Sequence, residues 1–188
     1  MVIAITGCIG SGKSYILNKI HTLYGYDVFS SDEFVRLSYK DKQVKEKLNE
    51  KFNCIVDGNV DKSIIKRQLN ESNINELNAI IHPFVIDKII EVKENYKQSL
   101  AFIEVPLLFE SNLEKLFDYT ISISVKDSLR HKRLKNRSVE NYNDMIKLEK
   151  YQLTNQEKAI RADFVLNSLE NDDDTLANLN SIIKAIVK

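Results

Sequence analysis

The strongest constraint on the fold of this chain is a glycine-rich segment close to its amino terminus. Residues 7–14 read GCIGSGKS and fit the pattern G-x-x-x-x-G-K-[ST]. The segment follows an apolar run, residues 2–6, typical of a buried strand, and it leads into residues 13–24, whose apolar positions recur at helical spacing. A loop of this composition between a strand and a helix is typical of a phosphate cradle. The segment therefore predicts a P-loop that binds a nucleoside triphosphate.

The residue types in this loop suit that chemistry. Glycine lets backbone N–H groups turn inward around phosphate oxygens without a Cβ clash, and the start of the following helix adds a favourable dipole. Lys13 is expected to reach the β- and γ-phosphates, and Ser14 is expected to bind Mg²⁺. The plain alternative is a glycine-rich turn before an ordinary helix. The nucleotide-binding residues expected from this loop are Gly7, Gly10, Ser11, Gly12, Lys13 and Ser14.

An alternation of strands and helices predicts the fold class. With 5 glycines and 2 prolines, the chain has too few turn residues for an all-β sandwich or barrel. The segments that read as strands are residues 2–6, 26–30, 100–105, 119–125 and 164–166. Helical patterns cover residues 13–24, much of 31–99, 127–137, 142–153 and the end of the chain from residue 172. We therefore expect an α/β fold with a five-stranded parallel sheet, covered by helices on both faces and binding ligands at the carboxyl ends of its strands.

The helical region between residues 31 and 99 contains two candidate helix starts. Asp61 is a residue type that caps helices through its side-chain oxygen. His82 precedes Pro83, and proline is favoured at the first position of a helix. We therefore expect helices to begin at Asp61 and at His82.

Composition limits the partners and the compartment. Lys+Arg and Asp+Glu number 27 each, so no global positive field would hold the chain to nucleic acid or to an anionic membrane. The two cysteines make no disulfide framework, which favours a reducing compartment. The start of the chain lacks the pattern of a signal peptide, and no apolar run is long enough to span a bilayer. These features predict a soluble cytoplasmic protein of one compact domain, with no membrane and no nucleic-acid partner.

Two carboxylates lie at the expected ends of strands. Asp32 follows the second strand, where it would accept or orient the proton of an acceptor hydroxyl in line with the γ-phosphate. The alternative is that Ser31 or Asp32 only caps the next helix. Glu104 ends an apolar strand and would orient Mg²⁺ through water, although a charged residue at a strand end is common. Residue type alone leaves both alternatives open.

A basic helix is expected over residues 127–137. Five of the eight residues 130–137 are Lys or Arg, in a chain of zero net charge. Arg133 and Arg137 are four apart and so share a helical face, and bidentate arginines suit the charge that spreads over a phosphoryl group in transfer. Such a helix would act as a lid that excludes water. The alternatives are a solvated surface helix or a small RNA-binding patch.

Missing motifs narrow the class of P-loop protein. The chain has no N-K-x-D segment to read guanine and no D-x-x-G switch followed by Gln. At 188 residues it has little room for the partner surfaces of an assembly ATPase. A kinase of a small metabolite is favoured. A kinase of a nucleotide or a sugar acid, and a non-catalytic module gated by ATP, remain alternatives.

Several further segments, in their order along nearly the whole chain, resemble the dephospho-CoA kinase family. The P-loop is a general motif, but a His-Pro pair, a Pro-Leu-Leu-Phe-Glu segment and a late Ala-Asp-x-Val segment are specific. The segments that carry the resemblance are residues 5–14, 31–32, 56–58, 61–62, 81–83, 105–110, 133–137, Gln152 and 162–167.

The resemblance implies an activity and a division of the chain. The reaction would be phosphorylation of the 3′-hydroxyl of dephospho-CoA by ATP with Mg²⁺, giving CoA and ADP in the last step of coenzyme A biosynthesis. The core would comprise residues 1–30, 100–125 and 160–188, with acceptor-binding helices over about 31–99 and a lid over about 126–155. A monomer or a small homo-oligomer is expected.

The resemblance also implies roles for single residues. Asp32 would orient the acceptor hydroxyl, with His82 near the acceptor. The catalytic groups on the phosphates would be Lys13, Arg133 and Arg137, and the metal would be held by Ser14 and Glu104.

Four positions depart from the family pattern. Tyr15 stands where the family usually has Thr, which moves a hydroxyl near the α-phosphate outward on a ring, yet the residue is still expected to bind nucleotide. Cys8 replaces a usual Gly, and Glu104 is one methylene longer than the usual Asp. Lys62 replaces Arg and so loses a bidentate fork. These departures concern affinity and metal geometry rather than the class of reaction.

Overall fold

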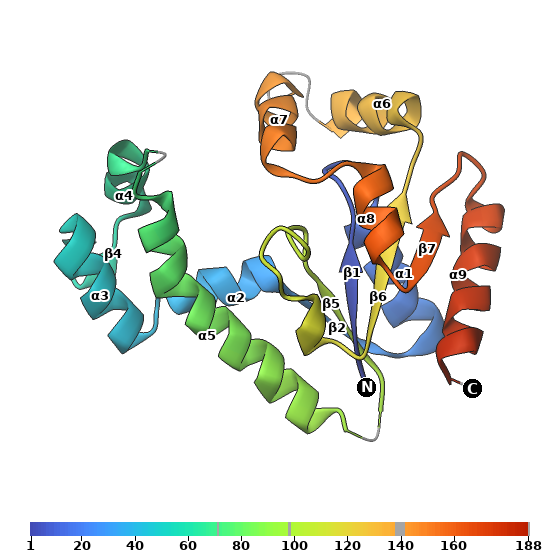
Figure 1. The fold of residues 1–188 in the computed structure, drawn as a ribbon, viewed down its shortest axis with the longest axis horizontal. Helices are drawn as coiled ribbons and strands as arrows, with labels where there is room; N and C mark the ends of the chain where they lie inside the picture. The colour runs from blue at the N-terminus through green and yellow to red at the C-terminus, as the bar shows by residue number, and fades with distance from the viewer. Residues whose placement is uncertain (71, 98, 138–141, 188) are drawn as a thin grey trace. The chain divides into compact units, whose positions relative to one another are not determined.

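The computed structural model of the protein describes residues 1–70, 72–97, 99–137 and 142–187 (Figure 1). The chain forms two compact units. The first unit holds residues 1–29 and 96–188, and the second holds residues 30–95. No helix in the described ranges is long and apolar enough to cross a membrane.

The first unit is built on a five-stranded sheet. Its strands are β1 (Val2–Thr6), β2 (Asp27–Ser30), β5 (Ala101–Glu104), β6 (Tyr119–Ser124) and β7 (Phe164–Asn167). Their spatial order is β2-β5-β1-β6-β7, and Ile5 of β1 lies in parallel register with Glu104 on one side and Ile121 on the other. The expected five-stranded parallel sheet is therefore confirmed.

Helices cover this sheet and explain its apolar strands. They are α1 (Lys13–Tyr24), α6 (Asp127–Arg137), α7 (Tyr142–Leu148), α8 (Asn155–Arg161) and α9 (Asp172–Val187). In Figure 1, α8 passes in front of β1 and β6, whereas α1 lies behind them. All five residues of β1 are buried, as a strand covered on both faces requires. On one face, Ile16 and Ile20 of α1 join Leu179 and Ile183 of α9 in a single apolar cluster with the strands.

The helix expected over residues 142–153 is shorter than predicted. Helix α7 ends at Leu148, and a turn of 3₁₀ helix, η2 (Glu149–Tyr151), follows it. Thr154 caps the next helix, α8, in a capping box with Glu157, and a residue in that role must leave helical geometry, so α7 cannot run unbroken into α8.

The second unit is mainly helical. It contains α2 (Ser31–Ser38), α3 (Lys42–Phe52), α4 (Lys62–Gln68) and α5 (Ile74–Asn95). Asp61 caps α4 by accepting a hydrogen bond of 2.8 Å from the Ser63 N–H, which confirms the helix start expected there.

A small hairpin in this unit was missed by the sequence reading. Strands β3 (Ile55–Val56) and β4 (Asn59–Val60) pair in antiparallel register. Asp57 and Gly58 join them with φ of 49° and 76°. Two central residues with positive φ make the turn that best matches strand twist, and Asp-Gly is a favoured sequence for it.

The helix start expected at His82 is wrong. His82 and Pro83 both lie inside α5, which runs for 22 residues. A proline inside a helix removes one backbone hydrogen bond and costs about 3 kcal/mol. The stripe of buried side chains continues on both sides of the proline at helical spacing, through Ile81, Val85 and Ile89. The burial of these side chains offsets the free-energy cost of the proline, so the helix continues through Pro83.

Candidate active site

The glycine-rich loop joins β1 to α1 in the first unit. Its tight path needs backbone conformations that favour glycine: Gly10 has φ 80° and Gly12, the N-cap of α1, has φ 96°. A Cβ on Gly10 would also lie 2.8 Å from Cγ of Leu134 in α6. The loop therefore has the strand–loop–helix context of a phosphate cradle, and α6 packs directly against it.

Lys13 is folded back over this loop. Its side chain is buried, and Nζ donates to the carbonyl oxygens of Gly7 at 2.9 Å and Cys8 at 3.2 Å. These bonds compensate the buried ammonium group, which a protein interior would otherwise not tolerate. The positive charge is therefore held at the loop itself.

Two other members of the loop region differ in exposure. Ser11 is fully buried, and its Oγ has no hydrogen-bond partner among the residues that the structure describes. Tyr15 is exposed, and its hydroxyl donates to Asp172 at the start of α9. Partial desolvation, together with that hydrogen bond, raises the pKa of Tyr15. Lys19 Nζ lies 5.3 Å from the centre of the Tyr15 ring and 3.9 Å from Asp172 Oδ2, so both side chains link α1 to the start of α9 through Asp172.

Ser14 and Glu104 supply oxygen atoms at the same edge of the sheet. Ser14 is in the first turn of α1, Glu104 is the last residue of β5, and the Ser14 hydroxyl donates to Glu104 Oε2 at 3.5 Å. Hydroxyl and carboxylate oxygens are the donors that Mg²⁺ takes, usually with one or two carboxylates and the phosphates of a substrate. In the described ranges, no group of three or more His, Cys, Asp or Glu side chains would hold a metal alone. The donor set fits a Mg²⁺ ion that arrives with phosphates.

Arg133 of α6 lies against the P-loop. Its Nη1 donates to the backbone oxygen of Ser11 at 3.3 Å and to Ser168 Oγ at 2.9 Å, and Nη2 donates to Leu169 O at 3.2 Å. Residues 168–169 follow β7, so the guanidinium group bridges the loop and that segment. Arg137 ends α6, but its side chain lies outside the described part of the structure, and its expected place on the same face stays a prediction.

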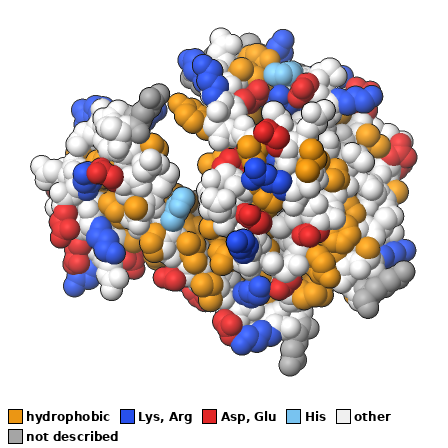
Figure 2. Space-filling model, in the orientation of Figure 1, with side chains coloured by type: hydrophobic (Ala, Val, Ile, Leu, Met, Phe, Trp, Pro, Cys, Tyr) orange, Lys and Arg blue, Asp and Glu red, His pale blue; other side chains and the backbone are white. Residues whose placement is uncertain are grey.

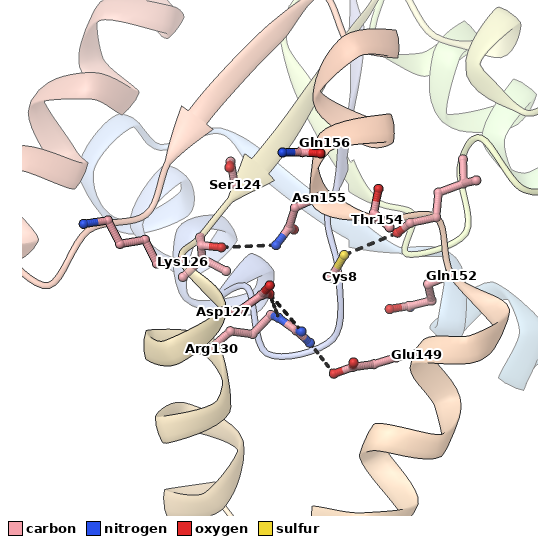
Figure 3. A pocket seen from close by; sticks show the side chains of 12 residues that line it. Cys8, Ser124, Lys126, Asp127, Arg130, Glu149, Gln152, Thr154, Asn155 and Gln156 are labelled. Atoms are coloured by element: carbon pink, nitrogen blue, oxygen red, sulfur yellow. Dashed lines mark hydrogen bonds and ion pairs between the residues drawn. The ribbon is translucent and has the colours of Figure 1, made fainter.

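Arg130 is a residue of the site that the sequence did not single out from the other basic residues of 130–137. It is 6% exposed, which separates it from the solvated charges expected of a surface helix, such as the exposed Lys132. Its guanidinium group lies between Asp127 and Glu149 and pairs with both (Figure 3), and Nη1 also donates to Ile9 O at 3.4 Å. Two arginines of the basic helix, Arg130 and Arg133, therefore contact the P-loop.

A cavity of about 610 Å³ lies beside the loop, close to these arginines (Figure 3). It is lined by the end of β6, the start of α6, Glu149 and residues 152–156, and Cys8 is its contact with the P-loop. Asn155 donates to Val125 O at 3.1 Å across it. Burial raises the pKa of the Cys8 thiol, so this cysteine is not activated as a thiolate.

The two acceptor-side residues expected from the sequence lie in the second unit. Asp32 is exposed in the first turn of α2, whose N-cap is Ser30 with no side-chain capping bond. The alternative in which Ser31 or Asp32 caps this helix is therefore wrong. His82 is half-buried in α5, and this burial lowers its pKa.

On one face of the molecule, charges of both signs are mixed. On the face drawn in Figure 2, Lys and Arg side chains are interspersed with Asp and Glu. A nucleic-acid interface normally presents a basic patch or stripe. That face carries none.

Comparisons with known proteins agree with this geometry. The family model described as dephospho-CoA kinase matches residues 1–176. A dephospho-CoA kinase from Rickettsia prowazekii is 31% identical over 98% of this chain and 96% of its own length. One from Fusobacterium nucleatum is 31% identical over 99% of this chain and 98% of its own length.

Solved structures share the fold. TT1252 from Thermus thermophilus aligns with a TM-score of 0.86 and 27% identity, over 100% of this chain and 98% of that one. A shikimate kinase from Bacteroides thetaiotaomicron, at a TM-score of 0.55 and 15% identity over 100% of this chain and 99% of that one, is similar in fold alone. From the family match and the relatives over nearly full length, the chain belongs to the dephospho-CoA kinase family, a family of phosphotransferase enzymes.

Proposed function

We propose that the protein transfers the γ-phosphoryl group of ATP to the 3′-hydroxyl of dephospho-CoA, giving CoA and ADP as the last step of coenzyme A biosynthesis. The observation that carries the proposal is the convergence of Lys13, Arg133 and the Ser14–Glu104 pair on one loop. Family membership over nearly the whole chain supports the choice of acceptor.

The triphosphate is bound by the loop together with Lys13, Arg133 and Arg137. The backbone N–H groups at the start of α1 receive the phosphate oxygens, with Tyr15 beside them. Lys13 exchanges its bonds to loop carbonyls for bonds to the β- and γ-phosphates, and the guanidinium groups of Arg133 and Arg137 neutralise charge on the transferred group. Ser14 and Glu104 would hold Mg²⁺, which supplies charge neutralisation on the phosphates when bound.

Asp32 is proposed to orient the acceptor. It comes two residues after the carboxyl end of β2, which is the edge of the sheet where ligands of such folds bind. The 3′-oxygen forms a bond to the γ-phosphorus as the bond from that phosphorus to the bridging oxygen breaks. The hydroxyl proton goes to Asp32 or to solvent, and the departing electrons stay on ADP.

The two remaining parts of the chain have proposed roles. Residues 31–99 hold the acceptor, with His82 near it, and residues 126–155 act as a lid over the phosphates.

The cysteines bear on the compartment of the protein. Cys8 and Cys54 are both free thiols, which supports a reducing compartment such as the cytoplasm. A monomer or a small homo-oligomer remains the expected assembly.

A coupled assay of ADP release with several acceptors tests the reaction. Dephospho-CoA should support turnover that depends on Mg²⁺, whereas AMP and a sugar acid should not. Turnover only with one of the other acceptors would overturn the assignment.

A pair of matched variants tests the role of Asp32. Asp32→Asn should lower kcat by about 10²–10⁴-fold, as removal of an acid–base group does, and should leave ATP affinity unchanged. Asp174→Asn makes the same chemical change at an exposed residue in the first turn of α9, outside the residues proposed to bind either substrate, and it should change neither quantity. Equal behaviour of the two variants would contradict the role of Asp32 and favour an ATP-gated binding module.

A further inference from the structure

A buried ion pair in the first unit has no role in the proposed reaction. Lys158 of α8 is completely buried, and its Nζ lies 2.8 Å from Glu110 Oε1 and 3.1 Å from Oε2. The same ammonium group donates to Pro106 O at 2.8 Å. Lys158 therefore has partners for its three protons and fixes the Glu110 carboxylate in place.

Glu110 has a further partner in the segment that precedes α8. The backbone N–H of Leu153 donates to Glu110 Oε1 at 2.7 Å. We use the word strap for residues 152–153. The ion pair therefore holds one end of the strap through a charge-assisted hydrogen bond, which is stronger than a bond between neutral groups.

The strap in turn contacts the start of the P-loop at two successive residues. The side-chain oxygen of Gln152 accepts a hydrogen bond of 2.9 Å from the Ile9 N–H. The backbone oxygen of Leu153 accepts one of 3.4 Å from the Cys8 thiol. Arg130 also donates to Ile9 O, so the N–H and the carbonyl oxygen of Ile9 both bond to residues of the proposed lid, Gln152 and Arg130.

We propose that Glu110 and Lys158 are positioning residues for the P-loop. The pair holds the strap, and the strap fixes Cys8 and Ile9 in the conformation that lets the loop receive phosphates. Neither charged side chain needs to touch a substrate. The inference rests on the proposed use of this loop as the nucleotide site.

Double variants separate this role from simple stability. Removing one charge would leave the other buried without compensation, which destabilises a protein strongly, whereas removing both charges avoids that penalty. Glu110→Gln with Lys158→Met keeps an oxygen that accepts the Leu153 N–H. Glu110→Leu with Lys158→Met has similar volume and no acceptor. The second double variant should release the strap more than the first.

The accessibility of the Cys8 thiol measures whether the strap is in place, because the thiol donates to Leu153 O. Cys8 is 7% exposed, and Cys54 is the only other cysteine. In a Cys54→Ser background, the rate of Cys8 modification by a chromogenic disulfide measures release of the strap without any need for turnover. The dissociation constant of ATP, measured by calorimetry, gives the second readout, and thermal melting follows stability.

We expect the Gln/Met double variant to lie between the parent and the Leu/Met double variant in both readouts, because the Leu153 N–H keeps an acceptor but loses the charge-assisted bond and the contact of Lys158 with that acceptor. The Leu/Met double variant should react at Cys8 about tenfold faster and bind ATP about tenfold more weakly, as loss of a hydrogen bond to a charged group predicts. Glu91→Gln, in an exposed pair with Lys88, is the matched control and should change neither readout. If the Leu/Met protein does not fold, Gln152→Ala provides an independent test, because it removes the acceptor of the Ile9 N–H. It should shift both readouts in the same direction.

Equal thiol reactivity and equal ATP affinity in the Gln/Met and Leu/Met proteins would overturn the proposal, as would a difference in melting temperature alone. If the Leu/Met protein does not fold, parent-like values in Gln152→Ala would overturn it. A parent protein that fails to bind ATP would contradict the proposed function instead, and the thiol readout would still judge the strap.

Discussion

The hydroxyl of Ser14 lies 3.5 Å from Oε2 of Glu104, which links the first turn of α1 to the last residue of β5. The two strands that lead to this point, β1 and β5, are neighbours in parallel register. Parallel pairing is what brings a serine and a glutamate that are 90 residues apart in sequence to one edge of the sheet.

This pairing predicts how the enzyme responds to magnesium. Glu104→Gln removes the charge but keeps the size of the side chain, so the Mg²⁺ concentration for half-maximal turnover should rise by about tenfold or more. Glu104→Asp keeps the charge and should stay near the parent. A magnesium titration of turnover checks both, with Glu91→Gln as an exposed control. An unchanged midpoint in Glu104→Gln would exclude the glutamate from the metal site.

Arg133 should be important for catalysis. Arg133→Ala removes a fixed positive charge beside the loop, and kcat should fall by about 10²–10³-fold, as for loss of one preorganised donor. Arg133→Lys should recover only part of the loss, because an ammonium group cannot make the bidentate contacts of a guanidinium group. Lys132→Ala, in the same helix and exposed, is the control and should behave as the parent. Steady-state kinetics with saturating ATP gives the comparison, and parent-like turnover in Arg133→Ala would contradict the role.

Gly10 should tolerate no side chain. At Gly10→Ala, a φ of 80° strains the new residue and its Cβ would lie 2.8 Å from Cγ of Leu134. We expect a loss of about 1–3 kcal/mol in the free energy of unfolding, as for overpacking, together with weaker ATP binding. Gly25→Ala is the matched control, since its φ is 71° but nothing lies within 4 Å of the added Cβ. Chemical denaturation measures both proteins, and equal losses would mean that the contact with α6 is unimportant.

His82 predicts a dependence of stability on pH. Burial lowers its pKa from the ordinary value of 6.5, so the unfolded chain takes up a proton at a higher pH than the folded protein does. Stability should therefore fall as the pH is lowered through about 6.5 toward the lower folded pKa. In His82→Gln this part of the decline should vanish. Melting temperatures of the two proteins between pH 5 and 8 test the prediction, and parallel curves would contradict it.

Much of the fold could be predicted because its signals are local. Strands β1 and β5 contain apolar runs and β6 is rich in β-branched residues, and α1 and α6 begin and end where their patterns predict. The hairpin was also encoded locally, in Asp57-Gly58, although its strands of two residues are too short to give an alternating pattern. The helix start predicted at His82 was wrong because the preference of proline for the first helical position is a local rule. In α5 the burial of side chains on both sides of the proline outweighs that preference.

The candidate site could be predicted only where one segment carries it. The P-loop is contiguous, so its residues could be named from the sequence. The partners that hold the loop come from distant segments: Ile9 and Gln152 are 143 residues apart, and Glu110 and Lys158 are 48 apart. No spacing rule joins such pairs. The burial of Arg130 likewise depends on Glu149, which the basic run does not reveal.

The most direct test of the account is phosphorus NMR of the product formed from ATP and dephospho-CoA, with Lys13→Ala in parallel. The account predicts a new phosphomonoester signal at the 3′ position with the parent enzyme. It also predicts that the rate falls by at least about 10²-fold when the lysine is removed, as for loss of a preorganised cation on the phosphates. No 3′-phosphate from the folded parent, or an undiminished rate in Lys13→Ala, would contradict it.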